Sequence, residues 1–139
     1  MERVRYQRGL RYELPCEHAA RIVFPSIRAS IAKVLQEEYD VNKYTIAKIL
    51  GTTPAAVTFY LVGRRGDRYT RKIEGMPEVA RVVRRVARLL LESYNERKSI
   101  DHSLYQLAFC SVCSKVNELA IDHGCPATLF ESKLSPEPP

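Results

Sequence analysis

Four cysteines are the residues of this 139-residue chain whose types and spacing point most directly to chemistry. Cys110 and Cys113 form a C-x-x-C pair within a helical pattern, and their i, i+3 spacing places both sulfurs on one side of that helix. Cys125 follows a glycine at which the chain can turn back, and it precedes a proline, as in one ferredoxin pattern. Cys16 is far away in the sequence but precedes the helical core, so it could supply a fourth thiolate.

Three or four thiolates suit either a tetrahedral zinc ion or an iron–sulfur cluster. Histidines are alternative ligands: His123 is the nearest to Cys125, and the other two are His18 and His102. Other interpretations stay open, since the cysteines could instead be small buried residues or a disulfide pair. Thiol redox catalysis is disfavoured, because a thioredoxin-like C-x-x-C needs a βαβ setting that this helical pattern lacks.

Two short helices are predicted between residues 41 and 66. The first ends at Gly51, because glycine adopts the left-handed conformation without steric cost. Thr52 or Thr53 then caps a second helix, which has Pro54 in its first turn and ends at another glycine. Apolar residues at helical spacing mark the two helices: Ile46, Ile49 and Leu50, then Val57, Tyr60 and Leu61.

Two helices joined so tightly must cross steeply, so the contact between them needs small residues. Ala47 and Gly51 provide these, and Val57 is the apolar residue that the second helix inserts. The pattern predicts a helix-turn-helix motif whose second helix lies in the major groove of DNA. A helical hairpin with no role in DNA binding is the alternative interpretation.

The outward face of the second helix would meet the DNA. Its outward positions are Thr53, Ala55, Ala56, Thr58 and Phe59. Thr58 can hydrogen-bond a base edge, and Ala55 or Phe59 can pack on a thymine methyl group, although Phe59 could instead pack on a neighbouring segment. The arginines that follow would hold phosphates without reading sequence. The expected DNA contacts are Thr53, Ala55, Thr58, Phe59, Arg64, Arg65 and Arg68.

Charge is concentrated beside this motif. The chain has a net charge of +6 and an isoelectric point near 9.3. Residues 60–100 contain eleven Lys and Arg against five Asp and Glu, an excess equal to that of the whole chain. Such a footprint favours a nucleic-acid partner. With no membrane-length apolar run, signal-like segment, phosphate loop or catalytic triad pattern, we expect a cytoplasmic, soluble protein that is not an enzyme.

Four segments divide the chain. Residues 1–14 form a basic arm that could track DNA or remain a solvated tail, and residues 15–75 form the helix-turn-helix domain. Residues 76–131 form a helical dimerisation and cysteine region, and residues 132–139 form a disordered tail. Within the second segment we expect an amphipathic helix over residues 25–39, with its stripe at Ile27, Ile31, Val34 and Leu35, and a charged loop, either a wing or a linker, over residues 66–75.

Two longer helices are expected in the third segment. One runs from Pro77 to Asn95, and its arginines at positions 81, 84, 85 and 88 share one face that could clamp phosphates or remain solvated. The other starts at a cap, Asp101 or Ser103, and runs to about Ile121. Its expected stripe contains Leu104, Leu107, Ala108, Phe109, Val112, Val116 and Leu119. Either helix could form the surface of a homodimer.

The motifs resemble those of an archaeal family of predicted helix-turn-helix transcriptional regulators that carry a C-terminal cysteine cluster. The similar stretches are L-P-C-E from Leu14, F-P-S-I-R from Phe24 and I-A-K-I-L-G-T-T-P-A-A-V-T-F-Y-L-V-G-R-R-G from Ile46. The family's recognition segment has serine and a polar residue where this chain has Thr58 and Phe59, which affects base preference. At motif strength the resemblance covers well under half of the chain.

The resemblance implies a DNA-binding regulator, and it favours including Cys16 with Cys110, Cys113 and Cys125 as ligands. Together with the residue patterns, it leads us to expect an all-α protein that binds double-stranded DNA sequence-specifically as a homodimer. A [4Fe–4S] cluster is the favoured cofactor and would make the regulator responsive to redox state or iron. The alternative is a non-specific nucleic-acid-binding or adaptor protein with a structural zinc.

Overall fold

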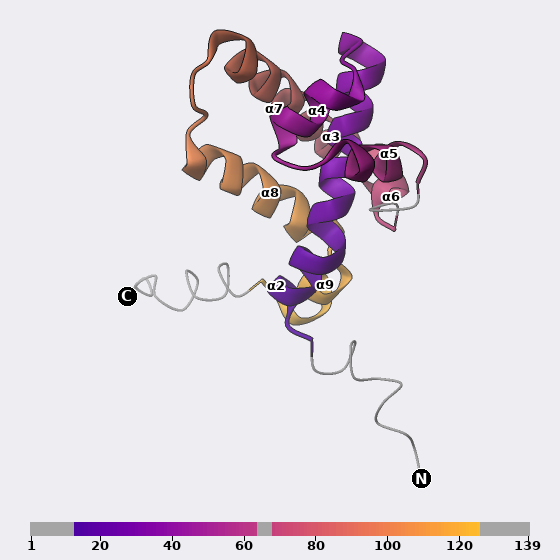
Figure 1. Cartoon of the computed structure of the whole chain (residues 1–139). Coiled ribbons are helices and arrows are strands. Elements are labelled where there is room, and N and C mark those ends of the chain that lie inside the picture. Colours follow the sequence, from indigo (N-terminus) through magenta and orange to yellow (C-terminus); the bar gives the residue numbers. More distant parts are fainter. Residues whose placement is uncertain (1–12, 64–67, 126–139) are drawn as a thin grey trace, which may run out of the picture.

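The computed structural model describes residues 13–63 and 68–125, and these ranges are all-helical (Figure 1). The expectation of an all-α fold is therefore confirmed for the described chain. The basic arm up to Arg11, the arginines at 64 and 65, and the predicted tail lie outside the described residues. The helices are α2 (Pro15–His18), η2 (Ala19–Val23), α3 (Phe24–Tyr39), α4 (Lys43–Leu50), α5 (Pro54–Leu61), α6 (Thr70–Gly75), α7 (Pro77–Glu96), α8 (His102–Val116) and α9 (Glu118–His123).

The first three elements form one continuous helical rod from Pro15 to Tyr39, which is longer than the helix expected to begin at residue 25. The residues at both junctions, His18 and Val23, have right-handed helical backbone angles. The stretch η2 is π-helical, and Phe24 donates its backbone N–H to the oxygen of Ala19. A wider turn fits the sequence here, because the proline that follows Phe24 has no N–H to continue the α-helical pattern.

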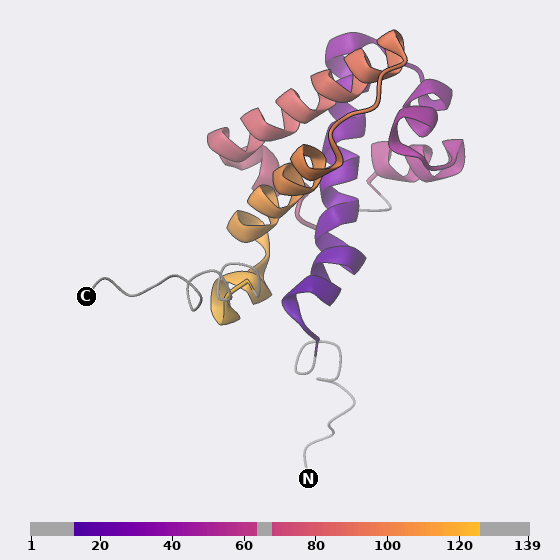
Figure 2. The ribbon, with the colours of Figure 1, turned by 90° about the vertical axis from the view of Figure 1, so that its left-hand side faces the viewer.

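Helix α3 lies at the centre of the molecule and packs against α5, α6, α7 and α8 (Figures 1 and 2). Its predicted stripe is confirmed, since Ile27, Ile31 and Leu35 are buried and Val34 is half-buried. In both views α2 and α9 lie side by side at one end of the molecule, and α4 lies toward the other end. One rod therefore connects the neighbourhood of Cys16 to α4 and α5.

Local bonds define α4, α5 and the turn between them. The side chain of Asn42 accepts from the N–H of Thr45 at the start of α4, and that of Thr53 accepts from the N–H of Ala56 in α5. Gly51 has a left-handed backbone with φ of 66°. A Cβ added at Gly51 would meet nothing within 4 Å, so its predicted role as a small contact residue is wrong. Its left-handed conformation is what requires glycine.

Two predictions for the later part of the chain are also wrong. The segment expected to be a charged loop contains α6, which buries Thr70 and Ile73. The expected last helix is divided at Asn117, which ends α8 and caps α9. The predicted long helix is confirmed as α7, and Asp101 caps α8. In the part of the chain described, no helix combines the length and apolar character needed to cross a bilayer.

Candidate nucleic-acid face and cysteine site

The outward face of α5 carries most of the residues predicted to meet DNA. Thr53 and Ala55 are exposed, and Phe59 keeps 41% of its surface exposed. Thr58 is half-buried, and its hydroxyl donates to the carbonyl oxygen of Pro54 at 3.1 Å. Ala56 is only 3% exposed, so its predicted outward position is wrong. This face is small and largely apolar.

Buried residues on the opposite side fix the direction in which this face points. Val57 is fully buried and Tyr60 is 7% exposed, as predicted from their spacing. Both belong to the core that α3 builds with its neighbours. Because the helix cannot turn without exposing these two side chains, Ala55 and Phe59 are held at the surface.

Exposed basic side chains also lie on elements other than α5. Arg68 is exposed, lies 3.8 Å from a carboxylate oxygen of Glu118 and stacks near the ring of Tyr69. The four arginines predicted to share one face of α7 are all exposed. Two of them already have acidic partners, because Arg84 lies 3.3 Å from Glu38 and Arg88 lies 3.7 Å from Glu92. Such surface pairs are weak, so they leave the arginines free to exchange partners.

The cysteines come from three segments near the Pro15 end of the helical rod, away from α4. Cys16 lies on α2, Cys110 and Cys113 lie on α8, and Cys125 follows α9 after Gly124, whose φ is 84°. Burial raises the pKa of the Cys110 thiol, and so do the charges of Cys125 and Cys16. Cysteines from three separate parts of the sequence are thus near enough for their charges to interact.

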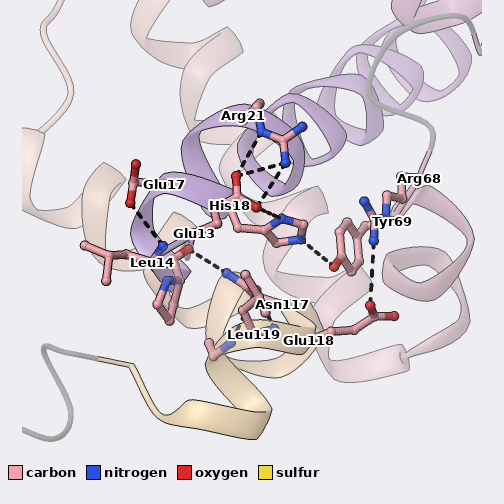
Figure 3. Close-up of polar contacts among 12 residues, drawn as sticks. Glu13, Leu14, Glu17, His18, Arg21, Arg68, Tyr69, Asn117, Glu118 and Leu119 are labelled. Carbon is pink, nitrogen blue, oxygen red and sulfur yellow. Dashed lines mark hydrogen bonds and ion pairs between the residues drawn. The ribbon is translucent and has the colours of Figure 1, made fainter. Parts of the chain in front are cut away.

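Asn117 holds this end together. Its side chain is fully buried, and its amide nitrogen donates to the oxygen of Pro15 at 3.0 Å and to the sulfur of Cys113 at 3.3 Å. Its amide oxygen accepts from the N–H groups of Leu119 and Ala120, which caps α9. One side chain therefore connects α2, α8 and α9, as Figure 3 shows for α2 and α9.

A second group of polar side chains connects α2 to the segment before α6 (Figure 3). His18 is 1% exposed, with Nε2 2.8 Å from the hydroxyl of Tyr69 and Nδ1 3.2 Å from Glu13. Glu13 also accepts two hydrogen bonds from Arg21. Because both ring nitrogens of His18 already have partners, its predicted alternative role as a metal ligand is not supported. Figure 3 also shows Glu118 next to Tyr69 and Arg68.

Burial and the neighbouring cysteines raise the pKa of the Cys110 and Cys113 thiols, so a bound cation would favour their ionised forms. Burial raises the pKa of Cys113, the Asn117 hydrogen bond lowers it, and the charges of the other three cysteines raise it. Among the described groups that shift these two thiol pKa values, none is a cation. A metal bound to thiolates would offset their mutual repulsion. In the described ranges, no three His, Cys, Asp or Glu side chains already surround an ion position, so the sulfurs would have to move closer together.

Sequence reasoning missed Asn117 and the contact between His18 and Tyr69. Asn117 precedes Glu118, and an asparagine at that place is a helix-start signal. It also lies within a continuous apolar pattern, which predicts a helix interior instead. Nothing in the spacing of His18 and Tyr69 indicates that they meet, because 51 positions separate them.

Comparison with known proteins identifies no relative. No family model matches the chain, and neither a curated protein nor a solved structure matches it. The similarity to archaeal regulators therefore rests on the quoted sequence motifs alone.

Proposed function

We propose that the protein is a sequence-specific, DNA-binding transcriptional regulator in which α4 and α5 form the helix-turn-helix motif. The observation that supports this most is the geometry of α5, which buries Val57 and Tyr60 and leaves Thr53, Ala55 and Phe59 at the surface. A capped helix that follows a glycine turn and rests on a third helix, here α3, is the arrangement that such motifs use. The net charge of +6 favours the same partner.

Binding selection from random duplexes, followed by competition at fixed salt, tests this function. A regulator should enrich one sequence and should prefer it over unrelated duplexes by at least about 10³-fold. Ala55→Glu should abolish this preference, because it places a carboxylate on the exposed face of α5 that would meet phosphates and base edges. The matched control is Gln106→Glu, which adds the same charge at an exposed position of α8. Equal loss in both variants would contradict the assignment of α5.

The alternative is binding without sequence preference, and one observation favours it. The hydroxyl of Thr58 already donates to Pro54, and Ala55 and Phe59 offer no hydrogen bonds. Few described polar groups of α5 are therefore free to read bases, whereas several exposed arginines can contact phosphates. Equal affinity for unrelated duplexes in the competition assay would favour this alternative. The protein would then be a non-specific nucleic-acid-binding or adaptor protein, with zinc as its structural metal.

We further propose that Cys16, Cys110, Cys113 and Cys125 hold the cofactor, with a [4Fe–4S] cluster favoured over zinc. When bound, a cluster supplies reversible electron transfer, whereas zinc supplies only cross-linking. The chain's own residues would then join α2 to α8 and to the segment after α9. Because α2 continues into α3, and α3 packs against α5, loss of this junction would alter how α5 is presented to DNA.

Anaerobic purification with metal and sulfide analysis tests the cofactor. A brown protein containing iron and acid-labile sulfide supports a redox- or iron-responsive regulator. A colourless protein with one zinc removes the sensing role and leaves the DNA-binding role intact. A chain free of both metals, with four titratable thiols under reducing conditions, would contradict the proposed cofactor.

The regulator is proposed to act as a cytoplasmic homodimer on double-stranded DNA. A single reading helix covers few base pairs, so two copies on a two-fold site are the usual route to specificity. An apolar groove between α7 and α8 is the candidate contact between copies, and it contains Leu104 and Leu107, which are 49% and 66% exposed. Sedimentation of the parent and of Leu107→Glu tests it, since a dimer that stays intact in the variant would exclude this surface.

A further inference from the structure

We propose that Asn117 is the positioning residue of the cysteine site, where it sets the placement of Cys113 relative to the Cys16 segment and directs an N–H at the Cys113 sulfur. This inference rests on the cysteine part of the proposed function and is independent of DNA binding. The asparagine lies where α8 ends and α9 begins, next to the start of α2 (Figure 3).

Every hydrogen-bonding group of this side chain is occupied. An asparagine amide has two N–H donors and an oxygen with two lone pairs. The donors serve Pro15 and Cys113, and the oxygen serves the N–H groups of Leu119 and Ala120. The partners also distinguish the amide oxygen of Asn117 from its amide nitrogen, because backbone N–H groups can only donate and the carbonyl of Pro15 can only accept. The side chain is fully buried, so water does not replace these bonds.

Helix capping alone does not account for this arrangement. Capping needs only the side-chain oxygen, which Asn42 supplies to Thr45 at the start of α4. At Asn117 the two N–H donors make additional bonds, to the residue before Cys16 and to the sulfur of Cys113. An aspartate would cap α9 as well but has no donor, and a serine would cap it with a single hydroxyl on a shorter side chain in place of the two N–H donors.

A hydrogen bond to a ligand sulfur affects metal binding directly. Partners of this kind orient the ligand and stabilise its ionised form, and their loss typically lowers metal affinity by about 10- to 100-fold. The bond to Pro15 acts in the same direction, since it holds α2 beside α8 before any metal arrives. Asn117 would therefore hold the ligand segments in position before metal binds, in addition to stabilising the fold.

The test is a titration of the reduced, metal-free full chain with Co²⁺ alone, followed by its thiolate-to-cobalt charge-transfer absorbance. Asn117→Asp and Asn117→Ser both keep a cap for α9 and remove the two amide N–H donors; the aspartate has no donor, and the serine has only one hydroxyl on a shorter side chain. We expect each to weaken cobalt binding by about 10- to 100-fold and to change the charge-transfer band. Asn42→Asp makes the same chemical change at another helix cap and should bind cobalt like the parent.

Several outcomes would overturn the inference. One is parental cobalt affinity and spectrum in both folded Asn117 variants, even if their thermal midpoints fall, because that pattern indicates a structural role only. Another is a parent chain that binds no cobalt through thiolates. If the variants fail to fold, the parent still provides a test: added Zn²⁺ should shift the NMR signals of the Asn117 side-chain amide and not those of Asn42. Absence of that shift would also overturn the inference.

Discussion

The α4–α5 pair and the cysteine end are stabilised by different kinds of contact. In the pair, the polar side-chain bonds join residues three or four positions apart, such as Asn42 with Thr45 and Thr58 with Pro54. At the cysteine end, Asn117 bonds to a residue 102 positions away, and His18 bonds to Tyr69 over 51 positions. The first region is therefore specified by its own sequence, whereas the second forms only when distant segments have already met.

The range of these hydrogen bonds indicates which region can change state independently. Short-range bonds re-form whenever the local helix forms, so the internal structure of α4 and α5 is insensitive to events elsewhere, even where the placement of the pair is not. Long-range bonds between short helices cost more chain entropy to make, so this end should open at lower free energy than the core. The proposed response to metal or redox state would depend on such local opening.

The largest expected effect comes from Asn117→Leu, which removes all four hydrogen bonds at once. It leaves the carbonyl of Pro15 and two N–H groups of α9 without this partner, at about 1–3 kcal/mol for each group that stays buried. Hydrogen exchange should then lose protection in α2 and α9 and keep it in α4 and α5. Uniform loss over the whole chain would show that the two regions are not separable.

A smaller effect is expected inside the α4–α5 pair from Val57→Ala. Val57 is fully buried between the pair and α3, so truncation should lower the free energy of unfolding by about 2 kcal/mol. Val62→Ala is the matched control, because Val62 is 61% exposed and should change stability by less than about 0.5 kcal/mol. Urea denaturation measures both, and similar losses would contradict the packing described for α5.

The turn itself should respond more modestly. Gly51→Ala places a side chain at φ of 66°, where space is open but the backbone is strained, so we expect a loss of about 1–2 kcal/mol. Gly75→Ala is the control, because space is equally open at this glycine, which ends α6 without a left-handed φ. It should be neutral or slightly stabilising. Thermal unfolding distinguishes them, and equal midpoints would mean that conformation does not explain Gly51.

The smallest expected effect is a pH dependence at the cysteine end. Burial raises the pKa of Tyr69, so its neutral form is favoured by folding. This stabilisation is complete below the ordinary tyrosine value of 10.0 and is lost as pH rises through the higher folded pKa. Urea midpoints measured on both sides of pH 10 should therefore fall more steeply for the parent than for Tyr69→Phe. Tyr44→Phe, at an exposed tyrosine, should retain the parental slope.

What the sequence could predict follows the same division. The caps at Thr53 and Asp101, the turn at Gly51 and the span of α7 were predictable, because each depends on residues within one or two turns of helix. The stripe expected on the last helix is buried only in part: Phe109, Val112 and Val116 are buried, whereas Leu104 and Leu107 are exposed. Helical spacing marks an apolar stripe without showing which part of it a neighbour covers.

The cysteine end could be predicted only in part. The spacing of Cys110 and Cys113 identified a candidate pair of ligands on α8, and the structure brings Cys16 and Cys125 near them. The break at Asn117 and the contact between His18 and Tyr69 were not predictable, because both depend on how α2, α6, α8 and α9 meet in space. Propensity rules describe single helices and say nothing about such meetings.

The uninterrupted rod from Pro15 to Tyr39 has a mechanical consequence. At a rise of about 1.5 Å per residue it is about 37 Å long, so a tilt of about 5° at one tip displaces the other by about 3 Å. A displacement of that size equals the length of a hydrogen bond to a base edge. A small tilt of the rod at its Cys16 end would therefore be magnified toward Tyr39 at its far end, and the π-helical stretch Ala19–Val23 lies close to the Cys16 end of this lever.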